Sequence, residues 1–171
     1  MVKRAAFFIL AAIVSSPAFT GTRADPAPRV EISHFSGKPV PRFEHLRFAA
    51  VNGRAGPSQR HRVVWRYERT GLPVLVIKES HDWRRVRDPD GDEVWIHARM
   101  LAPERRVLVL GDGELRDRPQ EGARVVARLT RGLVAGVASC RDEWCHISLD
   151  GRQGWFPRAR LWGTRPAEAP V

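Results

Sequence analysis

The chain has 171 residues, of which 43% are hydrophobic and 28% are charged, so its composition is that of a globular protein and excludes a disordered chain. Thirteen prolines and fourteen glycines favour many turns over long helices. The formal net charge of +10 indicates an acidic partner, whose nature depends on the compartment of the protein.

Residues 1–24 have the pattern of a signal peptide. A positively charged start precedes an apolar run over residues 5–14, which is too short to span a bilayer. Cleavage after Ala18 or after Ala24 would each leave alanine as the last removed residue. The alternative is an uncleaved anchor or a buried helix. We expect export to the periplasm or cell envelope, with no membrane-spanning segment in the mature chain.

Export changes which acidic partner the positive charge indicates. In a cytoplasmic protein it would suggest nucleic acid, but an exported protein does not meet that partner. The acidic groups of an envelope are peptidoglycan carboxylates and the phosphates of lipids or lipopolysaccharide. The alternative is that the charge only keeps the protein in solution.

The middle of the chain is duplicated. Trp83 matches Trp144, Trp95 matches Trp155, and the tripeptide at 62–64 matches that at 124–126. The spacing between matched residues shortens by one residue twice, each time within a stretch of turn residues, where a deletion costs least. This order predicts two domains, at residues 47–102 and 110–163. The flanking segments predict a proline-rich linker over 25–46 and a flexible tail over 164–171.

Each copy contains short runs of β-branched and aromatic residues that predict strands. The two sets of runs are 63–67, 72–77, 83–87 and 94–96 in the first copy, and 125–129, 134–138, 144–149 and 155–156 in the second. Asp-Gly turns at 90–91 and 150–151 join the last two runs of each set. Single helical turns are expected at 98–101 and 159–161. About five short strands in ~55–60 residues must close on themselves to bury one face, so the sequence predicts an all-β fold of two small barrels.

The order of these motifs resembles the bacterial SH3 (SH3b) domain family. A glycine with a hydrophobic strand is followed by Trp-x-x-Val, Asp-Gly, Trp-Ile or Trp-Phe and a final leucine, and residues 54–58 resemble the Arg-x-Gly-Pro opening of its members. Two tandem copies after a signal peptide resemble an exported bacterial subfamily. The resemblance implies SH3-like barrels, a binding role in the cell envelope and no catalysis.

The segment from Cys140 to His146 has the pattern Cys-x4-Cys-His and allows three interpretations. Haem attachment normally requires the spacing Cys-x-x-Cys-His, and a zinc site would need a further ligand that no neighbouring residue supplies. The duplication instead aligns the segment with a hairpin in the first copy, and two cysteines in an oxidising compartment favour a disulfide between Cys140 and Cys145. We therefore expect no cofactor and no metal.

Aromatic and basic side chains are the candidates for ligand binding. The segment Trp83-Arg84-Arg85-Val86-Arg87 combines an aromatic ring with guanidinium groups, which bind carboxylates bidentately. The repeated tryptophans either form the core or line a groove, and Trp65 and Trp162, which have no counterpart in the other copy, are expected between the domains. The full set of candidates is Tyr67, Trp83, Arg84, Arg85, Arg87, Trp95, Trp144 and Trp155.

Motifs of hydrolases, metalloproteases and nucleotide-binding enzymes do not occur in the sequence. Two hypotheses remain. The first is a non-catalytic envelope module that recognises peptidoglycan or an envelope protein through SH3-like grooves. The second is a structural or assembly module whose only partner is a protein, possibly another copy of itself.

Overall fold

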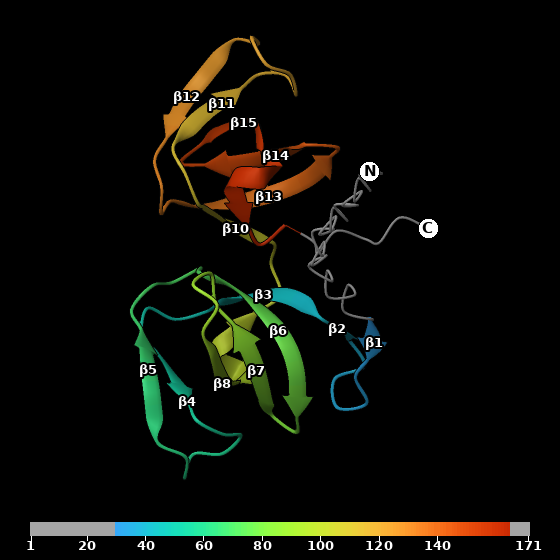
Figure 1. Ribbon diagram of the computed structural model, residues 1–171, viewed down its shortest axis with the longest axis vertical. Helices are drawn as coiled ribbons and strands as arrows, with labels where there is room; N and C mark the ends of the chain where they lie inside the picture. Colours follow the sequence, from blue (N-terminus) through green and yellow to red (C-terminus); the bar gives the residue numbers. More distant parts are fainter. Residues whose placement is uncertain (1–29, 165–171) are drawn as a thin grey trace, which may run out of the picture.

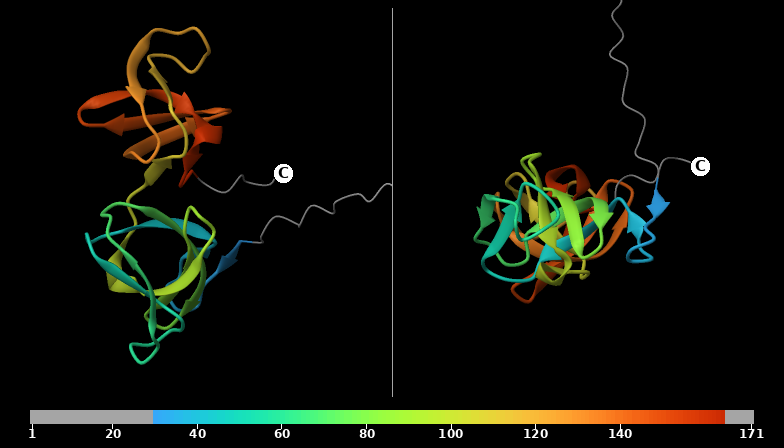
Figure 2. Two further views of the ribbon diagram at one scale, coloured as in Figure 1. Left: turned by 60° about the vertical axis from the view of Figure 1, so that its left-hand side comes forward. Right: turned by 90° about the horizontal axis from the view of Figure 1, so that it is seen from below.

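The computed structural model describes residues 30–164, so the predicted signal peptide and nearly all of the predicted tail lie outside the described residues. Two β domains follow one another along the long axis of the molecule, joined by a short connection (Figures 1 and 2). Within the described residues no helix is long and apolar enough to cross a membrane.

The first domain is one antiparallel sheet with the strand order β5-β4-β8-β7-β6-β3-β9. Its strands are β3 (Arg42–Leu46), β4 (Val51–Arg54), β5 (Val63–Tyr67), β6 (Pro73–Ser80), β7 (Trp83–Arg87), β8 (Glu93–His97) and β9 (Leu101–Ala102).

The second domain repeats this order as β12-β11-β15-β14-β13-β10-β16. Its strands are β10 (Arg106–Val109), β11 (Gly113–Arg116), β12 (Val125–Leu129), β13 (Val134–Arg141), β14 (Trp144–Leu149), β15 (Arg152–Pro157) and β16 (Leu161–Trp162). A 3-10 turn precedes the last strand of each domain, η1 at Ala98–Met100 and η2 at Arg158–Arg160. The two separate, equivalent sheets confirm the predicted tandem architecture.

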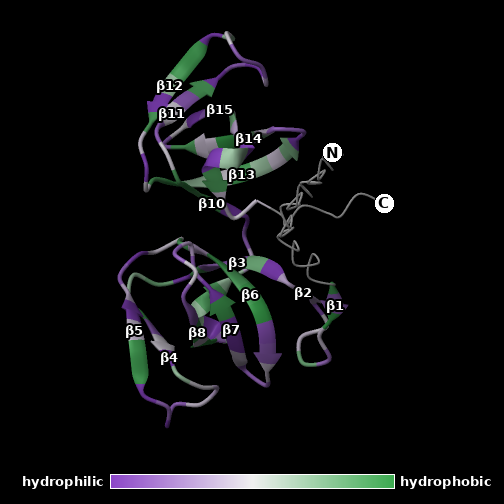
Figure 3. Ribbon diagram, in the orientation of Figure 1, coloured by the Kyte–Doolittle hydropathy of each residue, from purple (hydrophilic) through white to green (hydrophobic). Residues whose placement is uncertain are grey.

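Alternation along the strands explains why each sheet closes around a core. In β8, Val94 and Ile96 are buried, whereas Glu93, Trp95 and His97 point to the other side and are half-buried. The first core contains mainly valine, leucine and isoleucine with Tyr67, and the second adds Phe156 and Cys145. β6 changes from hydrophobic to hydrophilic along its length, because it ends in Lys78, Glu79 and Ser80 (Figure 3).

The predicted domain boundaries need a correction at both N-terminal ends. β3 lies within the segment expected to be linker, yet it pairs with β6 and β9 and buries Leu46 completely. Likewise β10 precedes residue 110 and buries Val107 and Val109. These strands were missed because Glu44 and His45 interrupt the hydrophobic pattern of β3, and because the duplication was aligned from its tryptophans and glycines.

The turns explain where the second copy is shorter. Five residues connect β7 to β8, whereas only Asp150 and Gly151 connect β14 to β15. Both of these residues have positive φ angles, 49° and 78°, as a two-residue type I′ hairpin turn requires. The connection from β5 to β6 is also one residue longer than that from β12 to β13. Both deletions therefore fall in loops, as predicted.

A small N-terminal hairpin lies beside the first barrel. It consists of β1 (Glu31–Ile32) and β2 (Pro39–Val40), which pair antiparallel. Ser33 and Ser36 donate hydrogen bonds to the Glu79 carboxylate at 2.5 and 2.9 Å, so the hairpin is fixed to the far end of β6. The segment expected to be a linker therefore contains strands of its own.

Trp162 connects the two domains. Its indole Nε1 donates to the carbonyl of Pro73 at 3.1 Å, and its ring lies edge-on to Phe43 at 5.3 Å. Leu108, from β10, is packed into the core cluster of the first domain. Trp65, by contrast, is 52% exposed on the edge strand β5, so the expectation that it also lies between the domains is wrong.

Candidate functional site

The outer face of the β7–β8 hairpin collects the aromatic and basic side chains of the first domain. Cross-strand pairing sets Trp83 opposite His97, Arg85 opposite Trp95, and Arg87 opposite Glu93. Side chains of such pairs lie ~4.5–5.5 Å apart at Cβ and form one continuous surface. The rings of Trp83 and His97 meet edge to face at 5.3 Å.

A row of side chains crosses this face from strand to strand. Arg54 on β4 pairs with Trp95, Trp95 pairs with Arg85, and Arg85 pairs with Lys78 on β6. One half-buried indole therefore lies among three cationic side chains. We call the surface formed by Lys78, Trp83, Arg85, Arg87, Trp95 and His97 the basic aromatic face.

Glu93 is the acidic residue within this face. Its carboxylate binds Arg87 at 2.7 Å and Arg85 at 2.8 Å, while the arginine side chains remain 46% and 45% exposed. Exposed ion pairs of this kind contribute only ~0–1 kcal/mol. A ligand carboxylate could therefore compete with Glu93 for either guanidinium at little cost.

Arg84, which the sequence placed among the ligand-binding residues, lies on the opposite side of β7. Its side chain is 9% exposed, its Nε is 3.1 Å from the Glu79 carboxylate, and it donates to the carbonyls of His81 and Trp83. Strand alternation predicts this result, since Arg84 points inward with Val86. It is therefore a structural residue of the barrel.

Tyr67 is also buried, with 5% of its surface exposed. Its hydroxyl donates to Asp88 Oδ2 at 3.0 Å. Burial and the Asp88 carboxylate both raise the pKa of Tyr67 far above its ordinary value, so the phenol keeps its proton. Tyr67 therefore holds the β7–β8 loop and is not available to a ligand.

The second domain has an equivalent but less basic face. Trp144 lies opposite Pro157, and His146 lies opposite Trp155, with their rings 5.2 Å apart. The repeated tryptophans are thus half-buried on the outer faces of both barrels, outside both cores. Beside this face is a hollow of about 210 Å³. Its lining residues include Pro157, Arg116 and Arg160.

A repeated arginine shapes both faces. Arg54 Nη1 donates to the carbonyl of His61 at 2.8 Å, and Arg116 Nη1 donates to the matching carbonyl of Ala123, also at 2.8 Å. These hydrogen bonds hold the loop between β4 and β5 in the first domain and the loop between β11 and β12 in the second. The sequence indicated Arg54 only as the start of the Arg-x-Gly-Pro opening, and it did not place Lys78 or His97 at the site. The hairpin register set by the Asp-Gly turn is the signal that could have identified His97.

The disulfide between Cys140 and Cys145 is confirmed. The two residues are cross-strand partners on β13 and β14, and Cys145 is completely buried. Glu79 and Arg84 occupy the same paired positions in the first domain. The two copies therefore use different cross-links at one place, a covalent bond in one and a buried ion pair in the other. Among residues 30–164, no group of three or more potential ligands is arranged to hold a metal ion.

Comparisons with known proteins agree with this geometry. The family described as bacterial SH3 domain matches residues 49–103 and 111–163. No curated protein matches the sequence.

Solved structures give weaker similarity. NlpC2 from Trichomonas vaginalis has a TM-score of 0.34 at 12% identity, over 71% of this chain and 48% of its own. NlpC1 from the same organism has a TM-score of 0.33 at 14% identity, over 77% of this chain and 48% of its own. The chain thus spans about half the length of these proteins.

Proposed function

Because the chain belongs to the bacterial SH3 domain family, whose members are typically binding modules, we propose that it is an exported, non-enzymatic binding protein of the cell envelope. Its ligand is peptidoglycan or an envelope protein, recognised through carboxylate groups. The observation that carries this proposal is the basic aromatic face, where Trp83 and Trp95 lie beside the exposed Arg85 and Arg87.

The chemistry of this face suits a peptide or sugar that bears carboxylates. A guanidinium binds a carboxylate through two parallel hydrogen bonds, and a half-buried indole offers a flat apolar surface together with an N–H donor. The ligand would displace Glu93 from Arg85 or Arg87, so recognition exchanges one carboxylate for another. Such binding weakens as salt concentration rises, because the groups are exposed.

Co-sedimentation with insoluble peptidoglycan sacculi tests the proposal. We expect the protein to sediment with sacculi at low salt, and Arg85→Gln/Arg87→Gln to reduce the bound fraction several-fold without unfolding the protein. Arg124→Gln/Arg128→Gln is the matched control, since it removes the same charge from side chains that are 80% and 84% exposed in the second domain. Equal losses in both variants would mean general charge attraction, and no loss in either would refute the role of the face.

A second function is an assembly module with a protein partner. The observation that favours it is the edge strand β5, which exposes Val63 at 43% and Trp65 at 52%. An exposed edge with apolar side chains can pair with a strand of another chain. Absence of sedimentation at low salt, together with dimers in solution that Trp65→Ser abolishes, would support this function instead.

A further inference from the structure

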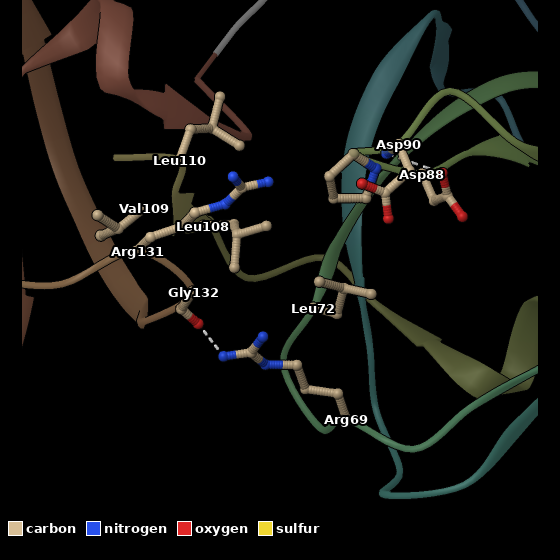
Figure 4. Close-up of a pocket in the computed structure, with 10 residues that line it drawn as sticks. Arg69, Leu72, Asp88, Asp90, Leu108, Val109, Leu110, Arg131 and Gly132 are labelled. Atoms are coloured by element: carbon tan, nitrogen blue, oxygen red, sulfur yellow. Dashed lines mark hydrogen bonds between the residues drawn. The ribbon is translucent and has the colours of Figure 1, made fainter. Parts of the chain in front are cut away.

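A cleft separates the two barrels on the side of the β7–β8 loop. Its volume is about 280 Å³. One wall is formed by Asp88, Pro89 and Asp90 of the first domain, and the facing wall by Arg131 and Gly132 of the second. Figure 4 shows the Arg131 side chain extending from its wall toward the loop that carries Asp88 and Asp90.

The floor of the cleft is apolar and fixed. It includes Leu72 and Leu108, both 8% exposed, and Val109, which is completely buried. On the near side, a hydrogen bond from the Arg69 guanidinium to the carbonyl of Gly132 connects the two domains. A charged group that enters above such a floor loses part of its screening by water, so its attraction to a charged wall is stronger than on an open surface.

The two walls carry opposite charges that are not satisfied by neighbours. Within residues 30–164, the Arg131 guanidinium makes no ion pair or hydrogen bond, and the same holds for the Asp90 carboxylate. Asp88 adds a further negative charge at 3% exposure. Its oxygens accept from the Tyr67 hydroxyl and from the amides of Asp90 and Asp92, so it holds the loop in place and leaves Asp90 as the accessible acid.

We propose that this cleft is a binding site for a small zwitterion, whose carboxylate binds Arg131 and whose ammonium group binds Asp90. The site is separate from the basic aromatic face, and the proposal does not rest on the function assigned to that face. A ligand with a single negative charge would satisfy Arg131 but would approach the aspartates unfavourably, and a simple cation would meet the reverse problem. Only a ligand with both charges suits both walls.

The size of the cleft limits the ligand. About 280 Å³ lies near the lower end of the ~300–1,000 Å³ typical of small-molecule sites. A free amino acid or a dipeptide has a suitable size and keeps its two charges a few bonds apart. The apolar floor favours a ligand with a small aliphatic side chain, such as alanine.

The probe is the unblocked dipeptide alanyl-alanine, titrated into the 15N-labelled mature protein. We expect saturable shifts of the backbone amides of Asp90, Leu110 and Gly132 in the millimolar range. N-acetylation or C-terminal amidation of the probe should each weaken binding at least ~10-fold, because each removes one charge-assisted contact. Arg131→Gln and Asp90→Asn should weaken it to a similar extent, while Arg128→Gln, at an exposed site on β12, should not change it.

Three results would overturn the proposal. The first is the absence of saturable shifts with alanyl-alanine up to ~100 mM, well above the expected range. The second is equal binding of the blocked and unblocked dipeptides. The third is weaker binding of the amidated dipeptide with unchanged binding of the acetylated dipeptide, which would mean that the cleft binds only the carboxylate. Both substituted side chains are exposed, so an unchanged amide spectrum in the absence of probe verifies that the variants are folded.

Discussion

Replacing Glu79 with glutamine tests the ion pair that stands where the second domain has its disulfide. The Glu79 side chain is 1% exposed and accepts from Ser33, Ser36, Arg42 and Arg84. Glutamine keeps the shape but removes the charge. Arg84 is then left 9% exposed without a carboxylate, whereas Arg42 keeps its ion pair with Glu44 at 2.8 Å.

Glu79→Gln should lower the free energy of unfolding of the first domain by a large fraction of its total. Breaking a buried ion pair from one side costs ~3–5 kcal/mol, and a domain of this size has a total stability of only ~5 kcal/mol. We therefore expect the unfolding transition of the first domain to fall by more than ~10 °C in Glu79→Gln. Calorimetry, with 15N spectra to assign each transition to a domain, measures the shift.

The control is Glu93→Gln, which removes a carboxylate that is 23% exposed from arginines that are about half-exposed. Glu93→Gln should lower the free energy of unfolding by less than ~1 kcal/mol. If Glu79→Gln and Glu93→Gln unfold within a few degrees of each other, the buried network around Glu79 does not stabilise the barrel.

The same carboxylate predicts a dependence on pH. Burial alone would raise the pKa of Glu79, but hydrogen bonds from Ser33, Ser36 and Arg42 hold it below the ordinary value of 4.5. Since the pKa is lower in the folded state, the carboxylate stabilises the domain above pH 4.5, and this stability is lost as the pH falls below that value. Glu79→Gln should lack this component of the acid unfolding curve.

Three further predictions concern the second domain and its contact with the first. Cys140→Ala/Cys145→Ala should lower the free energy of unfolding of the second domain by ~2 kcal/mol in urea titrations. The loss is modest because the loop that the disulfide closes is short. An unchanged free energy would mean that the disulfide does not stabilise the domain. Gly163→Ala should destabilise the same domain in thermal unfolding, since Gly163 has a φ of 102° and a Cβ there would lie 2.5 Å from the Arg106 carbonyl; a stabilised variant would disprove the strain. Trp162→Ala should increase the radius of gyration in small-angle scattering, because it removes the hydrogen bond to the Pro73 carbonyl and the ring contact with Phe43. Identical scattering curves would mean that other contacts hold the domains together.

The two-barrel architecture could be predicted from the sequence because the duplication is visible in it. Matched tryptophans and Asp-Gly turns located the two barrels and the disulfide hairpin, and the register of that hairpin made Cys140 and Cys145 partners. The sequence was insufficient for β3, where the hydrophobic pattern is broken by Glu44. That carboxylate is buried in an ion pair with Arg42, which lies two residues earlier on the same face of the strand, at 2.8 Å.

The candidate site was predictable only in part. The sequence grouped the aromatic and basic residues correctly on one hairpin, but it did not separate the two faces of β7. Arg84 was misplaced because its partner, Glu79, lies on another strand. Tyr67 was misplaced because its hydroxyl is satisfied by Asp88, which is distant in sequence. Long-range polar partners therefore decide which charged and aromatic residues remain accessible.

The indole N–H signals of the tryptophans report whether the protein binds an envelope ligand through the basic aromatic face. Soluble peptidoglycan fragments should be titrated into the 15N-labelled mature protein. We expect saturable shifts of the Trp83 and Trp95 indoles, while the Trp162 indole, which donates to the Pro73 carbonyl, stays unchanged as an internal reference. Shifts confined to Trp65, or no shift at any indole, would show that the basic aromatic face does not bind the ligand.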